Sequence, residues 1–213
     1  MTLEIEINNN IFVLHCSGAM YWVEKRMLLI SDPHLGKVSH FRKYGSAIPE
    51  GAIYKNFMKL DEVVNYFRPE SICFLGDLFH SELNNEWHLF DDWVSRIDIP
   101  IVLIAGNHDI INPAKYHDIN IRIVNEWELD GILLTHYPEM REDFFTLCGH
   151  VHPAVRLRGV GRQFLTLPCF FKSNNQMILP AFGAFTGTHI IKPSEGNAVY
   201  AITKEAVIAV EIK

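Results

Sequence analysis

Two histidines, His150 and His152, stand two residues apart directly after a glycine. If the backbone is extended there, alternate side chains point the same way, so both imidazoles lie on one side. Such a pair can bind a metal ion, but an ordinary polar strand face shows the same pattern. The interpretation as metal ligands therefore depends on the polar residues that the rest of the chain places near this pair.

The chain supplies further donors after several apolar runs. The full set of candidates is Asp32, His34, Asp77, Asn107, His108, Asp109, His136, His150 and His152. Carboxylate, imidazole and amide groups without a thiolate suit Mn²⁺, Fe²⁺ or Zn²⁺, not a cysteine-based structural zinc. Without His108 and Asp109, seven candidate ligands remain. Seven are too many for one ion, but they fit two ions that share a bridging carboxylate. Two ions about 3.5–4 Å apart can clamp a phosphoryl centre and supply a bridging hydroxide, which predicts phosphoester hydrolysis.

The first half of the chain predicts strands and helices that could bring these residues together. Residues 3–7 and 11–15 form a predicted hairpin, and a short strand follows near 20–23. Apolar runs at 27–31, 71–75 and 101–105 are typical of strands buried on both faces, and each ends at candidate ligands. Helices are predicted from residue 49 to 67 and around 87–97. This βαβ pattern indicates a parallel sheet, which binds ligands at the carboxyl ends of its strands.

The second half shows no helical periodicity. Strands are predicted at 132–135, 145–148, 163–167, 177–179, 189–191, 198–203 and 206–212. They suggest a second, mostly antiparallel sheet. The sequence therefore predicts one α/β domain over residues 1–213, with two sheets face to face and helices outside.

Charge is distributed unevenly along an acidic chain. The net charge is −6, which by itself argues against a nucleic-acid partner. The segment Phe144–Ser194, however, contains no Asp or Glu and carries +5, so the remaining residues carry −11. This asymmetry predicts a locally basic surface.

The order of the fragments Asp-x-His, Gly-Asp, Gly-Asn-His-Asp, His and Gly-His-x-His resembles the calcineurin-like metallophosphoesterases. The resemblance implies their fold, an α/β/β/α sandwich. It implies that one ion is held by Asp32, His34 and His152, the other by Asn107, His136 and His150, with Asp77 bridging both. It also implies that His108 stabilises the scissile phosphate or protonates the leaving oxygen, with Asp109 orienting its imidazole.

Other stretches resemble one branch, the DNA ligase-associated metallophosphoesterases of the DNA damage response. The resemblance runs from about residue 28 to 200 and is carried by residues 41–51, 75–81, 152–156, 167–170 and 179–187. It implies a manganese-dependent DNA endonuclease in DNA repair. It also implies a link to an ATP-dependent DNA ligase, a helicase and a nuclease encoded beside it.

Two basic loops are predicted to leave directly from metal ligands. The substrate-binding candidates in these loops are Lys37, Arg42, Lys43, Tyr44 and Arg156. Cations that follow phosphates, with aromatic rings that stack on bases, suit single-stranded DNA. The alternative is that both loops are simply solvated.

A small-molecule phosphodiesterase or pyrophosphatase on the same fold, and a catalytically silent scaffold, are competing functions. The scaffold would predict eroded ligands, whereas every ligand is present here.

The predicted location is the cytoplasm. The first residues lack the basic and apolar regions of a secretory signal. The sequence contains no run of 18 apolar residues, the length needed to span a membrane. The four cysteines are scattered, with no Cys-x-x-Cys pair, and buried free thiols are the expected state. We expect no membrane partner and either a monomer or a homodimer.

Overall fold

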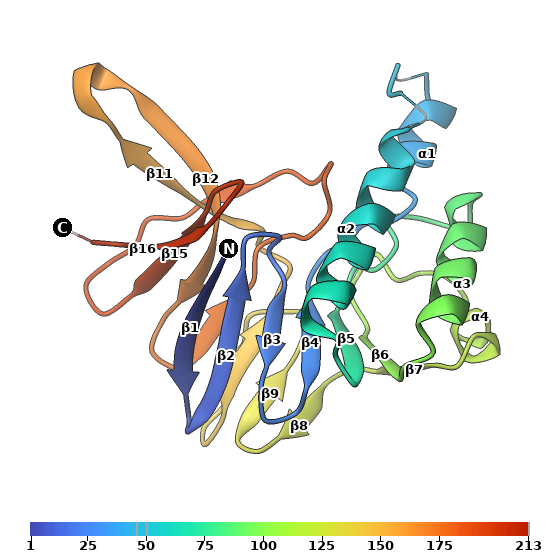
Figure 1. Cartoon of the computed structure of the whole chain (residues 1–213), viewed down its shortest axis with the longest axis horizontal. Coiled ribbons are helices and arrows are strands. Elements are labelled where there is room, and N and C mark those ends of the chain that lie inside the picture. Colours follow the sequence, from blue (N-terminus) through green and yellow to red (C-terminus); the bar gives the residue numbers. More distant parts are fainter. Residues whose placement is uncertain (46, 50, 213) are drawn as a thin grey trace.

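A computed structural model of the chain describes residues 1–45, 47–49 and 51–212. It contains two β-sheets packed face to face, with helices against the first sheet (Figure 1). The first sheet has the strand order β1-β2-β3-β4-β5-β6-β7. Its strands are β1 (Thr2–Ile7), β2 (Asn10–His15), β3 (Met20–Trp22), β4 (Met27–Ile30), β5 (Ser71–Leu75), β6 (Ile101–Ile104) and β7 (Ile121–Val124).

The first sheet is mixed. Strands β1 to β4 pair antiparallel, whereas β4, β5, β6 and β7 pair parallel. The predicted hairpin and the buried strands are confirmed, while β7 was not predicted. The carboxyl ends of β4, β5 and β6 lie together at one edge of the sheet, which is where the sequence placed most of the candidate ligands.

The second sheet has the strand order β14-β11-β12-β13-β10-β9-β8. In addition, β15 pairs with β12, and β16 pairs with β15. Its strands are β8 (Trp127–Leu129), β9 (Ile132–Leu134), β10 (Phe145–Cys148), β11 (Pro153–Arg158), β12 (Phe164–Lys172), β13 (Gln176–Ile178), β14 (His189–Ile190), β15 (Ala198–Ile202) and β16 (Val207–Val210). Parallel pairing joins β9, β10 and β13, so this sheet is more mixed than predicted.

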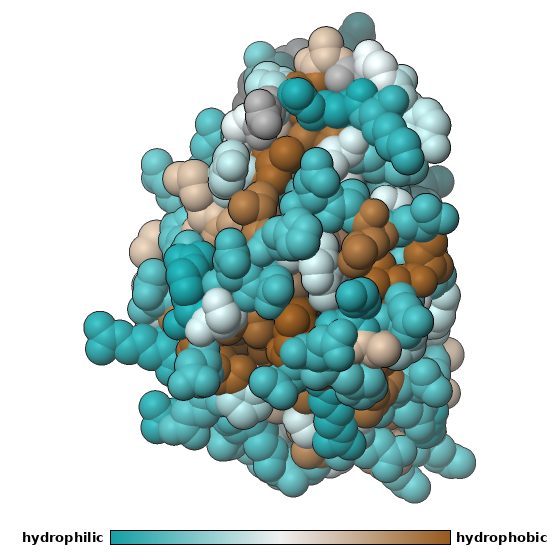
Figure 2. Space-filling view, turned by 90° about the vertical axis from the view of Figure 1, so that its right-hand side faces the viewer, coloured by the Kyte–Doolittle hydropathy of each residue, from teal (hydrophilic) through white to brown (hydrophobic). Residues whose placement is uncertain are grey.

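In the part of the chain that the structure describes, the helices all lie before residue 119, apart from one 3₁₀ turn, η1 (Val160–Arg162). They are α1 (Lys37–Lys43), α2 (Ala52–Phe67), α3 (Glu86–Ile97) and α4 (Pro113–Asp118). Helices α2, α3 and α4 pack on the outer face of the first sheet. Figure 2 looks onto this helical layer, where apolar patches are separated by hydrophilic side chains. Among the described residues, no helix has both the length and the apolarity to cross a membrane.

The main apolar core lies between the two sheets. Leu29 and Leu75 of the first sheet pack in one cluster with Leu134 and Leu147 of the second. The opposite faces of the same strands, including Leu28 and other residues, pack against the helices in another cluster. The central strands are therefore buried on both faces, as their continuous apolar sequences predicted.

Both predicted basic loops are instead ordered elements. The first contains α1, which lacks an apolar stripe because only Val38 is buried in it. Its first turn is held by the buried Glu86, whose carboxylate accepts hydrogen bonds from the backbone nitrogens of Gly36 (2.8 Å) and Ser39 (3.0 Å). The second is the antiparallel pair β11–β12, in which Arg158 lies opposite Phe164. We call this pair, residues 153–172, the β11–β12 arm; it projects from the body of the molecule in Figure 1.

Candidate metal centre

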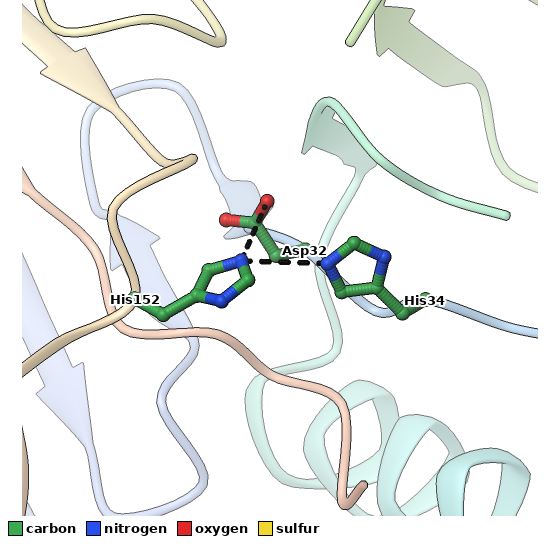
Figure 3. A group of neighbouring side chains, drawn as sticks. All are labelled: Asp32, His34 and His152. Atoms are coloured by element: carbon green, nitrogen blue, oxygen red, sulfur yellow. Dashed lines mark hydrogen bonds and ion pairs between the residues drawn. The ribbon is translucent and has the colours of Figure 1, made fainter. Parts of the chain in front are cut away.

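The first group of ligands lies where β4 ends and β11 begins. Asp32 and His34 follow β4, and His152 immediately precedes β11. Figure 3 shows their side chains converging. The Nε2 of His152 lies 3.3 Å from Oδ1 of Asp32 and 3.4 Å from Nε2 of His34. These three residues form a set whose donor atoms could all contact one ion. We call them the buried set, because Asp32 and His34 are almost inaccessible to solvent.

The chemistry of the buried set fits a cation. The Nδ1 of His152 donates to the carbonyl oxygen of Gly187 (3.2 Å), so its Nε2 carries the lone pair. Burial lowers the pKa of His34 to about 3, so its ring is neutral at neutral pH. Oδ1 of Asp32 is buried and accepts no hydrogen bond from the residues that the structure describes. Lone pairs and an unpaired carboxylate oxygen that face one point are costly without a positive charge between them, and this fits a metal ion.

Asp32 itself is held as an anion. Burial alone would raise its pKa, but the nearby imidazole of His152 and the hydrogen bond from Ser31 outweigh burial and lower the pKa. Its Oδ2 accepts hydrogen bonds from the Ser31 hydroxyl and from the backbone nitrogen of His150 (2.9 Å). The carboxylate therefore faces the site with its other oxygen free of hydrogen bonds.

The second group of ligands collects residues from the ends of β5, β6, β9 and β10. Nε2 of His136 lies 3.3 Å from Oδ1 of Asn107 and 3.1 Å from Nδ1 of His150. The Nδ1 of His136 donates to the carbonyl oxygen of Leu75 (3.0 Å), which leaves Nε2 as the donor for a metal. Asp77, His136 and His150 could all contact one ion, and Asn107 adds an amide oxygen. We call these four residues the open set, because His150 and Asn107 are exposed.

Asp77 joins the two sets. Its Oδ1 lies 3.5 Å from Nε2 of His136 in the open set, and its Oδ2 lies 4.0 Å from Nε2 of His34 in the buried set. One carboxylate therefore presents one oxygen to each set. This is the arrangement expected of the predicted bridging ligand.

The backbone is bent sharply at most of these ligands. Asp32, His34, Asp77, His150 and His152 all have φ between 47° and 68°, in the left-handed region. Each such residue makes folding less favourable by about 1–2 kcal/mol, and the cost is smallest for Asp, Asn and His. The packing around the site offsets this cost. The bends turn the side chains out of the strand direction and towards one point.

Glycines precede three of the ligands for a reason of space. A Cβ on Gly76, whose φ is +82°, would overlap the imidazole of His136. A Cβ on Gly106 would overlap the carboxylate of Asp77, and one on Gly149 would overlap Ser31. The Gly-Asp, Gly-Asn and Gly-His pairs of the sequence therefore let separate strands approach until their ligands meet.

Asp109 does not have the predicted role. Its carboxylate accepts hydrogen bonds from the backbone nitrogens of Asp77 (2.8 Å), Gly106 (2.9 Å) and Leu78 (2.9 Å), and among the described residues no hydrogen bond joins it to an imidazole. The imidazole of His108 is oriented instead by the carbonyl oxygen of His80, which accepts from Nδ1 (3.1 Å). Asp109 positions the loops that carry Asp77 and Asn107. Burial raises the pKa of Asp109 to about 6.

The substrate-binding candidates lie in different surroundings. Lys37 is partly buried beside the site, and the Nη1 of Arg42 donates to the carbonyl oxygen of Ile48 (2.6 Å). Lys43 and Tyr44 line one hollow at the end of α1. Arg156 lies over the ring of Phe164, 4.2 Å from its centroid, on the β11–β12 arm. Arg42 is thus tied to its own loop, and Arg156 packs within the arm.

Three residues of the site were not predicted to belong to it. His80 stacks on His108, with ring centroids 5.0 Å apart. The hydroxyl of Tyr137 donates to Oδ1 of Asn107 (3.3 Å), and its ring packs on that of His150, 4.7 Å away. Ser31 donates to Asp32. Each is a sequence neighbour of a ligand or lies three residues from one, but only the folded structure shows the contact.

Comparisons with known proteins agree with this geometry. A family model described as calcineurin-like phosphoesterase matches residues 25–172. The crystal structure of Pseudomonas putida nuclease MPE is similar to this chain with a TM-score of 0.82 and 30% sequence identity, covering 99% of this chain and 100% of that one. This match confirms the resemblance to the nuclease branch.

A curated protein of Arcobacter nitrofigilis, described as a probable glycerophosphodiester phosphodiesterase GpdQ, is 29% identical over 83 residues. The aligned part covers 38% of this chain and 28% of that protein, so the likeness reaches a minority of either. The match to the family model spans more than half of the chain and includes every candidate ligand. The chain therefore belongs to the calcineurin-like phosphoesterases and is a metal-dependent phosphoesterase.

Proposed function

We propose that this protein is a manganese-dependent endonuclease that cuts single-stranded DNA during DNA repair. The observation that carries the proposal is the position of Asp77, whose two oxygens face one donor set each. A centre with two sets and one shared carboxylate suits a phosphodiester, because both the attacking and the leaving oxygen need stabilisation. Carboxylate, imidazole and amide donors suit Mn²⁺, and also Fe²⁺ or Zn²⁺.

Two divalent ions held by these residues would supply Lewis acidity and an activated water. The chain itself supplies the proton for the leaving group. His108 donates the proton on Nε2 to the leaving oxygen as the P–O bond breaks, and the ring becomes neutral. The carbonyl oxygen of His80 holds the proton on Nδ1 throughout, so the ring keeps its orientation and returns to one tautomer. The contacts of Asp109 keep the segments of residues 77–79 and 106 in place.

A nucleic-acid strand fits the surroundings of the centre. Helix α1 begins three residues after His34, and the β11–β12 arm begins directly after His152, so both elements start at metal ligands. Figure 1 shows both elements along the upper edge of the molecule, the arm on the left and α1 on the right. The arm lies in the segment without Asp or Glu, and it presents Arg156, Arg158 and the exposed Phe164 on one face. Cations and aromatic rings together suit the phosphates and bases of a single strand.

A small-molecule phosphodiesterase is the second candidate. The partial likeness to a glycerophosphodiester phosphodiesterase favours it, since the same metal chemistry would serve a small diester. The two functions differ in what they require of the arm and α1. A nuclease needs both, and a small diester needs neither.

The cellular setting follows from the resemblance. We propose a cytoplasmic enzyme that works with an ATP-dependent DNA ligase, a helicase and a second nuclease. The ligase would seal the ends that remain after cutting and processing.

Circular single-stranded DNA tests the proposal, because a circle without ends is cut only by an endonuclease. The protein is stripped of metal and incubated with the circle, with and without Mn²⁺, beside the variant Asp77→Ala and the control Asp92→Ala. Asp92 is an exposed aspartate of α3 and is not one of the candidate ligands. We expect linear and shorter products with Mn²⁺ from the wild type and the control only. An intact circle with continued hydrolysis of a small diester would move the substrate to small molecules or DNA ends.

A further inference from the structure

A hollow of about 320 Å³ lies beside the metal centre. One wall is the end of α1, with His40, Lys43 and Tyr44. The other wall is formed by residues 81–84, which follow His80, and by Ile110, which follows Asp109. The hollow is therefore bounded by the segments that carry two residues of the proposed active site.

Three large apolar side chains line this hollow, among polar residues that include Glu82. Tyr44 is 72% exposed, Ile110 62% and Leu83 51%, and all three line the same hollow. Large apolar side chains grouped at an exposed site mark a binding surface more often than isolated ones do. Lys43 adds a cation, and it forms no ion pair among the residues that the structure describes.

A continuous series of aromatic rings connects the hollow to the metal centre. The ring of Tyr44 lies 4.9 Å from that of His40, which lies 5.6 Å from His80. His80 is stacked 5.0 Å from His108, and His108 lies 5.4 Å from the ligand His34. Within the hollow, His40 is thus two ring contacts from His108 and Tyr44 is three.

We propose that this hollow binds the nucleobase next to the scissile phosphate. The inference rests on the proposed nuclease function and adds a subsite to it. The π face of the base stacks on Tyr44, the apolar edge packs on Leu83 and Ile110, and Lys43 contacts the phosphate or an acceptor on the base. Stacking on an aromatic ring tolerates every base, so the subsite anchors the strand without reading its sequence. It places one phosphate beside His108.

The first test uses the variants Tyr44→Ala and Tyr44→Phe on a linear single strand. We expect Tyr44→Ala to lose about tenfold in kcat/KM and Tyr44→Phe to keep most of it, since the phenyl ring still stacks. Tyr66→Ala is the matched control, because Tyr66 is an exposed tyrosine at the carboxyl end of α2 and does not line the hollow. In the wild type, an abasic nucleotide on one side of a phosphate should suppress cutting there, and in Tyr44→Ala it should not.

The second test measures binding in the metal-free protein. A strand that contains 2-aminopurine should lose fluorescence on binding the wild type, through stacking, and should lose much less with Tyr44→Ala. Equal quenching by both proteins, or cutting that is indifferent to Tyr44 and to the abasic site, would overturn the subsite. If quenching depends on Tyr44 but the wild type cuts no strand, the subsite stands and the nuclease function fails.

Discussion

The two ligand sets of the metal centre differ in exposure although they share one bridging carboxylate. In the buried set, Asp32 and His34 are 0% and 3% exposed. In the open set, Asp77 and His136 are as deeply buried, but His150 and Asn107 face solvent. We infer that a substrate reaches the centre from the open side. We infer that the buried set holds its ion more firmly and that the open set exchanges its ion and admits the phosphodiester.

Replacing Asp77 by Ala should have the largest effect, because it removes a donor from both sets at once. We expect hydrolysis to fall to background and the content of bound metal to fall in both sets. Activity on a chromogenic diester and metal content after dialysis against Mn²⁺ are the measurements. More than a few per cent of wild-type activity at saturating Mn²⁺ would show that the two sets work independently.

His152→Ala and His150→Ala separate the sets. Each removes one imidazole, so each should remove one ion and leave the other. Native mass spectrometry in Mn²⁺ should show one ion retained per chain in each variant. The ion retained in His150→Ala, held by the buried set, should be the harder of the two to extract with a chelator. The reverse order would contradict the assignment of firm and exchangeable ions.

His108→Ala should slow turnover about 10²- to 10⁴-fold and leave both ions bound, since His108 serves the leaving group. The loss should be smaller on a diester whose leaving group needs no proton, such as a nitrophenolate. Comparing kcat for nitrophenyl and alkyl leaving groups, with metal content measured on the same samples, checks this. Release of metal from the variant would show that His108 belongs to a ligand set.

His150→Gly should be more stable than His150→Ala by about 1 kcal/mol, because residue 150 has φ of 68° and glycine adopts that conformation without strain. Both variants lack the same ligand, so the difference isolates the backbone. Denaturant midpoints of the two metal-free proteins are the measurement. Equal midpoints would mean that the bend at residue 150 costs nothing.

The smallest effect concerns pH. The pKa of His34 is about 3 in the folded chain because of burial, and its ordinary value is 6.5. The unfolded chain therefore binds more protons between these values, and His34 makes the metal-free protein less stable as pH falls below about 6.5. His34→Asn should weaken this dependence between pH 7 and 5. The opposite contribution of Asp109 is common to both proteins and cancels in the comparison. If the melting temperatures of the two metal-free proteins changed in parallel with pH, the assigned contribution of His34 would be contradicted.

Much of the fold could be predicted, because the strands β4, β5 and β6 are continuous apolar runs that end in polar residues. Helix α1 could not, since it buries only Val38 and shows no periodic stripe. Helices α2 and α3 were predicted, but their packing on the first sheet rather than on both sheets was not. The second sheet instead carries a small apolar cluster, including Val155 and Val199, among β11, β12 and β15.

The two donor sets could be expected from the sequence, because the types and order of their residues are specific. The role of Asp109 was predicted wrongly, because its neighbour in sequence is His108 but its partners in space are backbone nitrogens. The contact of His108 with the carbonyl of His80 joins residues 28 positions apart through main-chain geometry. No pattern of side chains reports such a contact.

Electron paramagnetic resonance of the Mn²⁺-loaded protein tests the central claim that Asp77 joins two donor sets into one centre. Two Mn²⁺ ions bridged by a carboxylate are magnetically coupled, so the wild type with two ions per chain should give the broad multiline spectrum of a pair. Asp77→Ala should give at most the six-line spectrum of isolated Mn²⁺. A six-line spectrum from wild-type protein that carries two ions would contradict the bridged centre.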